Sequence, residues 1–141
     1  MYGGMMVGVI VVTHGQFGKH LLEAAQIILG PQEQCAHIAV EGTVEMSGLL
    51  ADLKNTVKRM ETGEGVLILT DMFGGTPSNI SLSLLQPGKV DVLTGANLPM
   101  LLRILGSRNK SLNELAQEAK NAAIQGIVVA GEVLSRKITE V

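Results

Sequence analysis

The chain has 141 residues and a formal net charge of −2, and aromatic residues make up only 2% of it. This length predicts one domain over residues 1–141, with a single core built from Val, Ile, Leu, Ala and Met. No cluster of Lys and Arg stands out, which argues against nucleic-acid binding, and no apolar run is long enough to span a bilayer. With Cys35 as its only cysteine, the chain cannot form an internal disulfide or a thiolate metal cluster.

The N-terminus has no Lys or Arg before its first apolar run, so it lacks the basic region of a signal peptide. Together these features predict a cytoplasmic protein. Residues 1–4 (MYGG) precede the patterned part of the chain and are consistent with an alternative start of translation.

Apolar strand patterns alternate with amphipathic helix patterns. Residues 6–13 (MVGVIVVT) are continuously apolar and β-branched, which is typical of a strand buried on both faces. Residues 16–30 then show helical spacing and end at Gly30 and Pro31. The apolar stripe predicted for this helix comprises Phe17, Leu21, Leu22, Ala25, Ile28 and Leu29.

The remaining elements continue the alternation. Further strands are predicted over 35–40, 65–71, 90–95 and 126–134, and further helices over 46–60, 97–106 and 111–125, with another helix beginning at Thr76. Thr76 and Pro77 suit the N-cap and the first residue of a helix, and Ser111 with Glu114 forms a capping box.

This order predicts an α/β fold. Strands joined through helices imply right-handed crossovers and a doubly wound, mostly parallel sheet covered on both faces. We expect the order 2-1-3-4 for the first four strands and an antiparallel C-terminal strand over 126–134. In such sheets ligands bind beyond the carboxyl ends of the strands, where the strand order reverses, and the first and third strands are commonly neighbours there.

Two loops follow those two strands, and each opens with Thr and an ionisable residue. They are THGQFG (13–18) and TDMFGGTPSN (70–79), so His14 and Asp71 are predicted to face each other. A neutral imidazole is a nucleophile near neutral pH. A carboxylate bonded to one ring nitrogen fixes the tautomer and leaves the other nitrogen free to attack.

The GGTP segment predicts an anion site beside this pair. Backbone amides at a helix N-terminus bind phosphate, and Gly74 and Gly75 let the backbone approach closely. The Thr76 hydroxyl can cap the helix or donate to the anion. Each feature alone is common in purely structural roles, but the combination favours a histidine that accepts a phosphoryl group.

The other candidate ligands have simpler interpretations. His20 falls between apolar positions of the first helix and is interpreted as a surface or packing residue, and His37 as a residue of the second strand. Cys35 is interpreted as a small apolar filler. No metal site or cofactor is therefore predicted.

At this point the chain resembles a known family, the enzyme IIA domain of the mannose family of the bacterial phosphoenolpyruvate-dependent sugar phosphotransferase system. The resemblance spans nearly the whole chain, and THG combined with D-x-x-G-G-[ST]-P is specific. The matching stretches are VGVIVVTHGQFGKHLLEAAQIILG, GVLILTDMFGGTPSNIS and VLTGANLPMLL.

The resemblance implies a phosphocarrier. His14 would be phosphorylated at Nε2 by the phosphocarrier protein HPr and would pass the group to a histidine of an enzyme IIB partner. Asp71 would orient the ring. Gly74, Gly75 and Thr76 would hold the phosphoryl oxygens.

The resemblance also implies how the chain would assemble. Phe73 and Pro99 would help form the docking surface. The family is homodimeric with an exchanged C-terminal strand, here 126–134. The chain ends at Val141 without the Ala- and Pro-rich linker seen in many relatives, so IIB is expected as a separate subunit acting with membrane IIC and IID subunits.

Three alternatives remain open at this stage. The phosphocarrier subunit of dihydroxyacetone kinase shares the fold and an N-terminal histidine, although DMFGGTPSN favours the mannose type. A chelatase-like domain would need further metal ligands near His14. A nucleotide-binding module lacks support because neither G-x-x-x-x-G-K-[ST] nor G-x-G-x-x-G follows the first strand.

Overall fold

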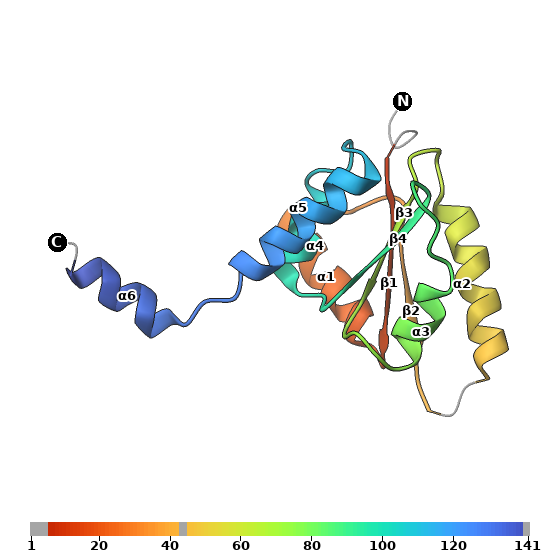
Figure 1. Ribbon diagram of the computed structural model, residues 1–141, viewed down its shortest axis with the longest axis horizontal. Coiled ribbons are helices and arrows are strands. Elements are labelled where there is room, and N and C mark those ends of the chain that lie inside the picture. Colours follow the sequence, from red (N-terminus) through yellow and green to blue (C-terminus); the bar gives the residue numbers. More distant parts are fainter. Residues whose placement is uncertain (1–5, 43–44, 140–141) are drawn as a thin grey trace.

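The computed structural model describes residues 6–42 and 45–139, so residues 1–4 lie outside the described part. Strands and helices alternate up to β4, after which helices follow one another (Figure 1). The strands are β1 (Gly8–His14), β2 (Cys35–Val40), β3 (Val66–Thr70) and β4 (Val90–Thr94). The helices are α1 (Phe17–Leu29), α2 (Met46–Met60), α3 (Thr76–Leu82), α4 (Leu98–Leu105), α5 (Leu112–Gln125) and α6 (Ala130–Thr139).

The four strands form one parallel sheet in the order β2-β1-β3-β4, as the sequence predicted. β1 and β3 are the central strands, which explains why their sequences are continuously apolar. Val12 pairs with Thr70 across these strands, and His14 pairs with Val40 of β2. The carboxyl ends of β1, β2 and β3 therefore meet at one edge of the sheet.

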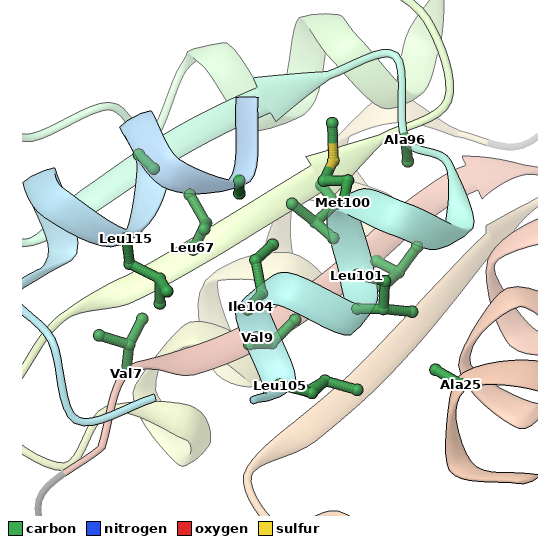
Figure 2. Close-up of a cluster of buried hydrophobic side chains, with 14 of the residues drawn as sticks. Val7, Val9, Ala25, Leu67, Ala96, Met100, Leu101, Ile104, Leu105 and Leu115 are labelled. Atoms are coloured by element: carbon green, nitrogen blue, oxygen red, sulfur yellow. The ribbon is translucent and has the colours of Figure 1, made fainter. Parts of the chain in front are cut away.

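Helices cover both faces, which confirms the doubly wound architecture. One apolar cluster joins the sheet to α1, α4 and α5 (Figure 2), and a second lies beneath α2 and α3. Alternate residues of β1 supply the two clusters: Val9 and Val11 face the first, whereas Ile10 and Val12 face the second. Burial on both faces holds the central strand ends in place, and the site is built on those ends.

The predicted stripe of α1 is only partly buried. Leu21, Leu22 and Ala25 are buried. Phe17, Ile28 and Leu29 are exposed, by 46%, 57% and 43%. The spacing gives the direction of an apolar stripe, but it does not say how far along the helix the neighbouring elements reach.

The helix starts are mostly those predicted. Ser111 Oγ accepts a hydrogen bond from the Glu114 amide at 3.2 Å, which confirms that cap. The start of α3 differs by one residue: Gly75 is the N-cap and Thr76 the first helical residue, with no side-chain cap. Gly75 has φ +85°, a conformation that glycine adopts readily and threonine does not.

The predicted fifth strand is wrong for the single chain. Residues 127–129 have no regular secondary structure, and α6 begins at Ala130 and stands away from the sheet (Figure 1). A strand needs a neighbouring strand edge for its backbone hydrogen bonds. This segment lies beside none in the described part of the chain. Within the described ranges, no helix has both the length and the apolar character required to cross a membrane.

The end of the sheet opposite the site is tied by Arg108, a residue without a predicted role. Its buried guanidinium donates hydrogen bonds to the carbonyl oxygens of Val7, at 2.8 Å, and Gln34, at 2.8 Å. Burial lowers the pKa of Arg108. Cys35 packs against the first apolar cluster, as expected of a filler, and burial raises the pKa of its thiol.

Candidate functional site

His14 and Asp71 lie side by side at the carboxyl edge of the sheet. They terminate or follow neighbouring parallel strands, and that topology brings residues 57 positions apart into contact. His14 Nδ1 lies 2.8 Å from Asp71 Oδ2, and the His14 backbone amide donates to the same oxygen at 2.9 Å. One carboxylate oxygen therefore fixes both the strand end and the ring of the histidine.

The environment keeps Asp71 ionised. Its side chain is only 16% exposed. Partial burial by itself raises the pKa of Asp71, but the hydrogen bonds from the His14 amide and ring outweigh this effect and lower the pKa below its usual value. The Met72 amide also donates to Oδ1, at 3.0 Å. Because an ionised carboxylate only accepts, the neutral imidazole carries its proton on Nδ1 and its free lone pair on Nε2.

Gly75 packs against the edge of the ring that bears Nε2. A Cβ atom at this position would lie 3.1 Å from His14 Cε1 and 3.2 Å from Nε2. Any residue other than glycine would therefore push the ring or occupy the space at its free nitrogen. Gly74 also has a positive φ, of +109°, but a Cβ there would meet nothing within 4 Å.

The turn between β1 and α1 is held by several short hydrogen bonds. The Gly15 amide donates to Val40 O at 2.8 Å, and Gly15 has φ +55°. The Gly18 amide donates to Thr13 Oγ1 at 2.8 Å. The sequence predicts no separate role for Thr13, which opens the first site loop as part of THG. A threonine five residues before a glycine, across a strand-to-helix turn, is the signal that could have indicated this contact.

The two loops that carry the pair also carry exposed apolar side chains. Phe17, Met72 and Phe73 come from the two site loops and are 46%, 54% and 74% exposed. The exposed position of Phe73 suits a docking residue. Pro99 lies in the first turn of α4, half-buried, where a Cβ atom on Gly126 would meet its Cγ at 2.5 Å. Nothing in the described residues brings Pro99 into contact with His14.

The remaining histidines lie apart from this pair. His20 is exposed on α1 and its Nδ1 lies 2.7 Å from Glu23 Oε1. His37 is exposed on β2. In residues 6–42 and 45–139, no three His, Cys, Asp or Glu side chains are grouped so that they could hold a metal ion.

These observations define an α/β protein with a histidine–aspartate pair at the carboxyl edge of its sheet. A family model described as "PTS system fructose IIA component" matches residues 8–124. The chain therefore belongs to this family, the IIA components of the sugar phosphotransferase system (PTS), within the mannose type that its sequence resembles.

Individual relatives agree with this assignment. The fructose-specific EIIA component of Bacillus subtilis is 29% identical over 133 residues, which cover 93% of this chain and 91% of that protein. The mannose-specific EIIAB component of Escherichia coli K12 is 29% identical over 126 residues, 87% of this chain. The matched part is 39% of the length of that relative.

Solved structures share the fold over most of the chain. The EIIA component of Streptococcus agalactiae has a TM-score of 0.81 at 30% identity, covering 90% of this chain and 99% of that one. A Streptococcus pneumoniae IIA protein associated with the fucose utilization operon has a TM-score of 0.83 at 25% identity, covering 92% and 97%. These likenesses agree with the parallel order of the four strands.

Proposed function

We propose that this chain is a histidine phosphocarrier of the sugar phosphotransferase system. His14 Nε2 attacks the phosphoryl group of phosphorylated HPr, so that the bond from phosphorus to the donor breaks as the bond to Nε2 forms. The reverse exchange then passes the group to a histidine of an enzyme IIB partner. The observation that supports this best is the 2.8 Å contact between His14 Nδ1 and Asp71, because in a neutral ring that donates Nδ1–H to the carboxylate the lone pair is on Nε2.

Asp71 and the glycine loop have complementary roles in this proposal. Asp71 holds the Nδ1–H tautomer and stabilises the positive charge that develops on the ring when Nε2 bonds to phosphorus. The amides of Gly74 and Gly75 and the hydroxyl of Thr76 hold the phosphoryl oxygens. Support comes from the closeness of Gly75 to Nε2 and from the preference of anions for helix N-termini.

Both protein partners would use the exposed side of the site. The His14 side chain is 51% exposed, and the exposed apolar residues Phe17, Met72 and Phe73 of the two site loops would offer a contact surface. Pro99 would extend this surface from α4. HPr and IIB would bind here in turn in the cytoplasm, while membrane IIC and IID subunits, rather than this chain, would select the sugar for uptake. The same carrier would serve equally in regulation.

We further propose that the chain works as a homodimer with exchanged C-terminal segments. Ile127, Val128 and Val129 are 74%, 65% and 62% exposed. β4 is the last strand of the sheet on its side. Gln86 pairs with Val90 at the start of its outer edge, whereas no strand of the described chain pairs with that edge beyond Val90. Deleting residues 126–141 should convert a dimer to a monomer in sedimentation experiments. An unchanged sedimentation coefficient would contradict the exchange.

The test of the phosphocarrier role is intact-mass analysis after incubation with phosphoenolpyruvate, enzyme I and HPr. We expect one added phosphoryl group, labile in acid, on the wild type and none on His14→Ala. His20→Ala is the matched control, since it removes an exposed histidine with a carboxylate partner from the neighbouring helix. It should be phosphorylated normally.

Two results would count against the proposal. Addition of a phosphoryl group to His14→Ala would mean that another residue is the acceptor. No addition to the wild type, in a tube where HPr itself is phosphorylated, would reopen the dihydroxyacetone kinase type of phosphocarrier and the non-PTS alternatives.

A further inference from the structure

We propose that the Thr13 hydroxyl is a positioning group for His14: it caps helix α1 from the end of strand β1 and thereby fixes the turn that holds the reactive ring. This inference rests on the proposed function of His14. It adds a residue that acts through the backbone and touches no reacting atom.

The first observation is the unusual start of α1. The amides of the first helical turn lack partners within the helix, and a side chain at the N-cap commonly accepts from one of them. Here the N-cap residue, Gln16, makes no such bond. The amide of Gly18, in the first turn, donates instead to Thr13 Oγ1 at 2.8 Å. The cap is thus supplied by the strand.

The second observation is that the contact is tightly packed. Thr13 is fully buried, and Gly18 is buried beneath it. A Cβ atom on Gly18 would lie 3.1 Å from Thr13 Oγ1 and 2.9 Å from Val11 Cγ1. The glycine therefore allows the helix to approach the strand closely enough for the hydroxyl to reach the amide. Neither atom has water available as a substitute partner, so losing the hydroxyl leaves a buried donor unpaired.

The third observation is where this contact acts. His14 directly follows Thr13, and its own amide is held by Asp71 while the next amide, of Gly15, is held by Val40. The Thr13–Gly18 bond closes the remaining side of the turn. With all three in place, the backbone that carries the ring has little freedom to move. Each hydroxyl donates to the carbonyl oxygen two residues on, Thr13 to Gly15 O at 3.5 Å and Thr70, at the same point of β3, to Met72 O at 3.3 Å. Among the described residues, the Thr13 hydroxyl also accepts from a helix amide, whereas the Thr70 hydroxyl does not.

The decisive variant is Thr13→Val. Valine keeps the shape and suits a buried strand, but its methyl group cannot accept a hydrogen bond. It would also sit inside van der Waals contact with an amide nitrogen at 2.8 Å, so the start of α1 must move away. Small displacements of a reacting group are costly, about 100-fold for 1 Å. We expect transfer from phosphorylated HPr to slow about tenfold or more, and Thr13→Ser to restore most of the rate.

The matched control is Thr56→Val. Thr56 is also buried, and its hydroxyl donates to the Asp52 carbonyl at 2.7 Å within α2. This variant loses a buried threonine hydrogen bond away from the site, so its transfer rate should equal that of the wild type. A comparable slowing in Thr56→Val would mean that general stability governs the rate, which would overturn the inference.

A second measurement does not depend on phosphorylation. The ¹H–¹⁵N NMR signals of the His14 ring should shift in Thr13→Val, return in Thr13→Ser and stay unchanged in Thr56→Val. If the wild type accepts no phosphoryl group, the proposed function fails, and the ring signals alone still decide the role of Thr13. Unchanged ring signals in Thr13→Val, with a wild-type rate where transfer occurs, would overturn it.

Two further outcomes complete the test. Equal slowing of Thr13→Ser and Thr13→Val would show that the hydroxyl is not the determinant. If Thr13→Val does not fold, hydrogen exchange of the Gly18 amide in the wild type takes its place. Protection similar to that of the β1 amides, together with a near-normal rate in Thr13→Ser, would support the inference. Exchange as fast as in an exposed loop would overturn it.

Discussion

The carboxyl edge of the sheet and the C-terminal segment differ in how many of their polar and apolar groups find partners within the single chain. At the edge, the backbone amides of His14, Gly15 and Gly18 donate hydrogen bonds to Asp71, Val40 and Thr13 and hold the turn around His14. Residues 127–129, in contrast, expose three adjacent apolar side chains and have no regular secondary structure. The site is held in place within one chain, whereas the apolar side chains of the C-terminal segment are not covered by the described part of that chain.

The energetic scale of this difference is considerable. Full burial of an aliphatic side chain stabilises a protein by about 1.5–3 kcal/mol. One net hydrogen bond stabilises a protein by about 1 kcal/mol. Leaving three such residues mostly exposed therefore loses several times that free energy. A partner that covered them would recover part of this free energy. Three substitutions and one pH measurement test the difference between the two regions, and they follow in order of decreasing expected effect.

The largest effect is expected from Gly75→Ala. The new methyl group would lie about as close to His14 Nε2 as the 3.2 Å of the constructed Cβ and would occupy the approach of the phosphoryl group. We expect transfer to fall at least about 100-fold, measured by quenched-flow mass analysis. Gly74→Ala is the matched control, since it places alanine at a similar positive φ without any contact within 4 Å. Equal losses in both variants would indicate backbone strain rather than blocking.

Asp71→Asn should have the second largest effect. The amide keeps the shape but loses the charge, so it can present its NH₂ group to the ring and favour the wrong tautomer. We expect transfer to slow about 10- to 100-fold while the acceptor remains His14. The same rate assay with tandem mass spectrometry checks both points. A wild-type rate would remove Asp71 from the mechanism.

A third substitution addresses the C-terminal segment. Val128→Lys should weaken the proposed dimer about tenfold, because a charge at the centre of an apolar interface loses its hydration. The rate of transfer to His14 should change little. Ile27→Lys is the control, as Ile27 is 85% exposed on α1 and outside the segment. Sedimentation equilibrium measures the constant, and equal weakening in both variants would contradict a specific role of residues 127–129.

The smallest effect concerns pH. Hydrogen bonds from His14 lower the folded-state pKa of Asp71 below its ordinary 3.8 despite partial burial. The folded protein therefore binds fewer protons than the unfolded chain, and this stabilisation is present above pH 3.8 and lost as pH falls through the lowered pKa. The difference in Tm between wild type and Asp71→Asn should shrink over that range. A difference that is constant or grows would contradict the assignment.

Much of the fold could be predicted from the sequence, because apolar periodicity identifies buried strands and amphipathic helices directly. The four-stranded order and the doubly wound layers follow from that alternation. The segment after Gly126 could not be assigned in the same way. GIVVAGEVL is apolar enough for a strand, yet Val133 and Leu134 also fit a helix, and only an adjacent strand edge decides between them.

The site was predictable where a side chain itself has the chemistry. His14 and Asp71 follow neighbouring strands, so their proximity could be inferred from topology alone. The contact of Thr13 with the Gly18 amide was not identified, because it depends on how closely the helix approaches the strand, and the spacing of the threonine and the glycine indicates such an approach only indirectly. The N-cap of α3 is Gly75 rather than the predicted Thr76 for a similar reason, because the positive φ of Gly75 is a property of the folded loop.

The exposure of the His14 ring has a kinetic consequence. Half of the ring is open to solvent, yet it offers a single free nitrogen on one side of the molecule. Donor and acceptor proteins would therefore compete for one face and could never occupy it together. On the proposed phosphocarrier role, one partner would have to leave this face before the other could bind it.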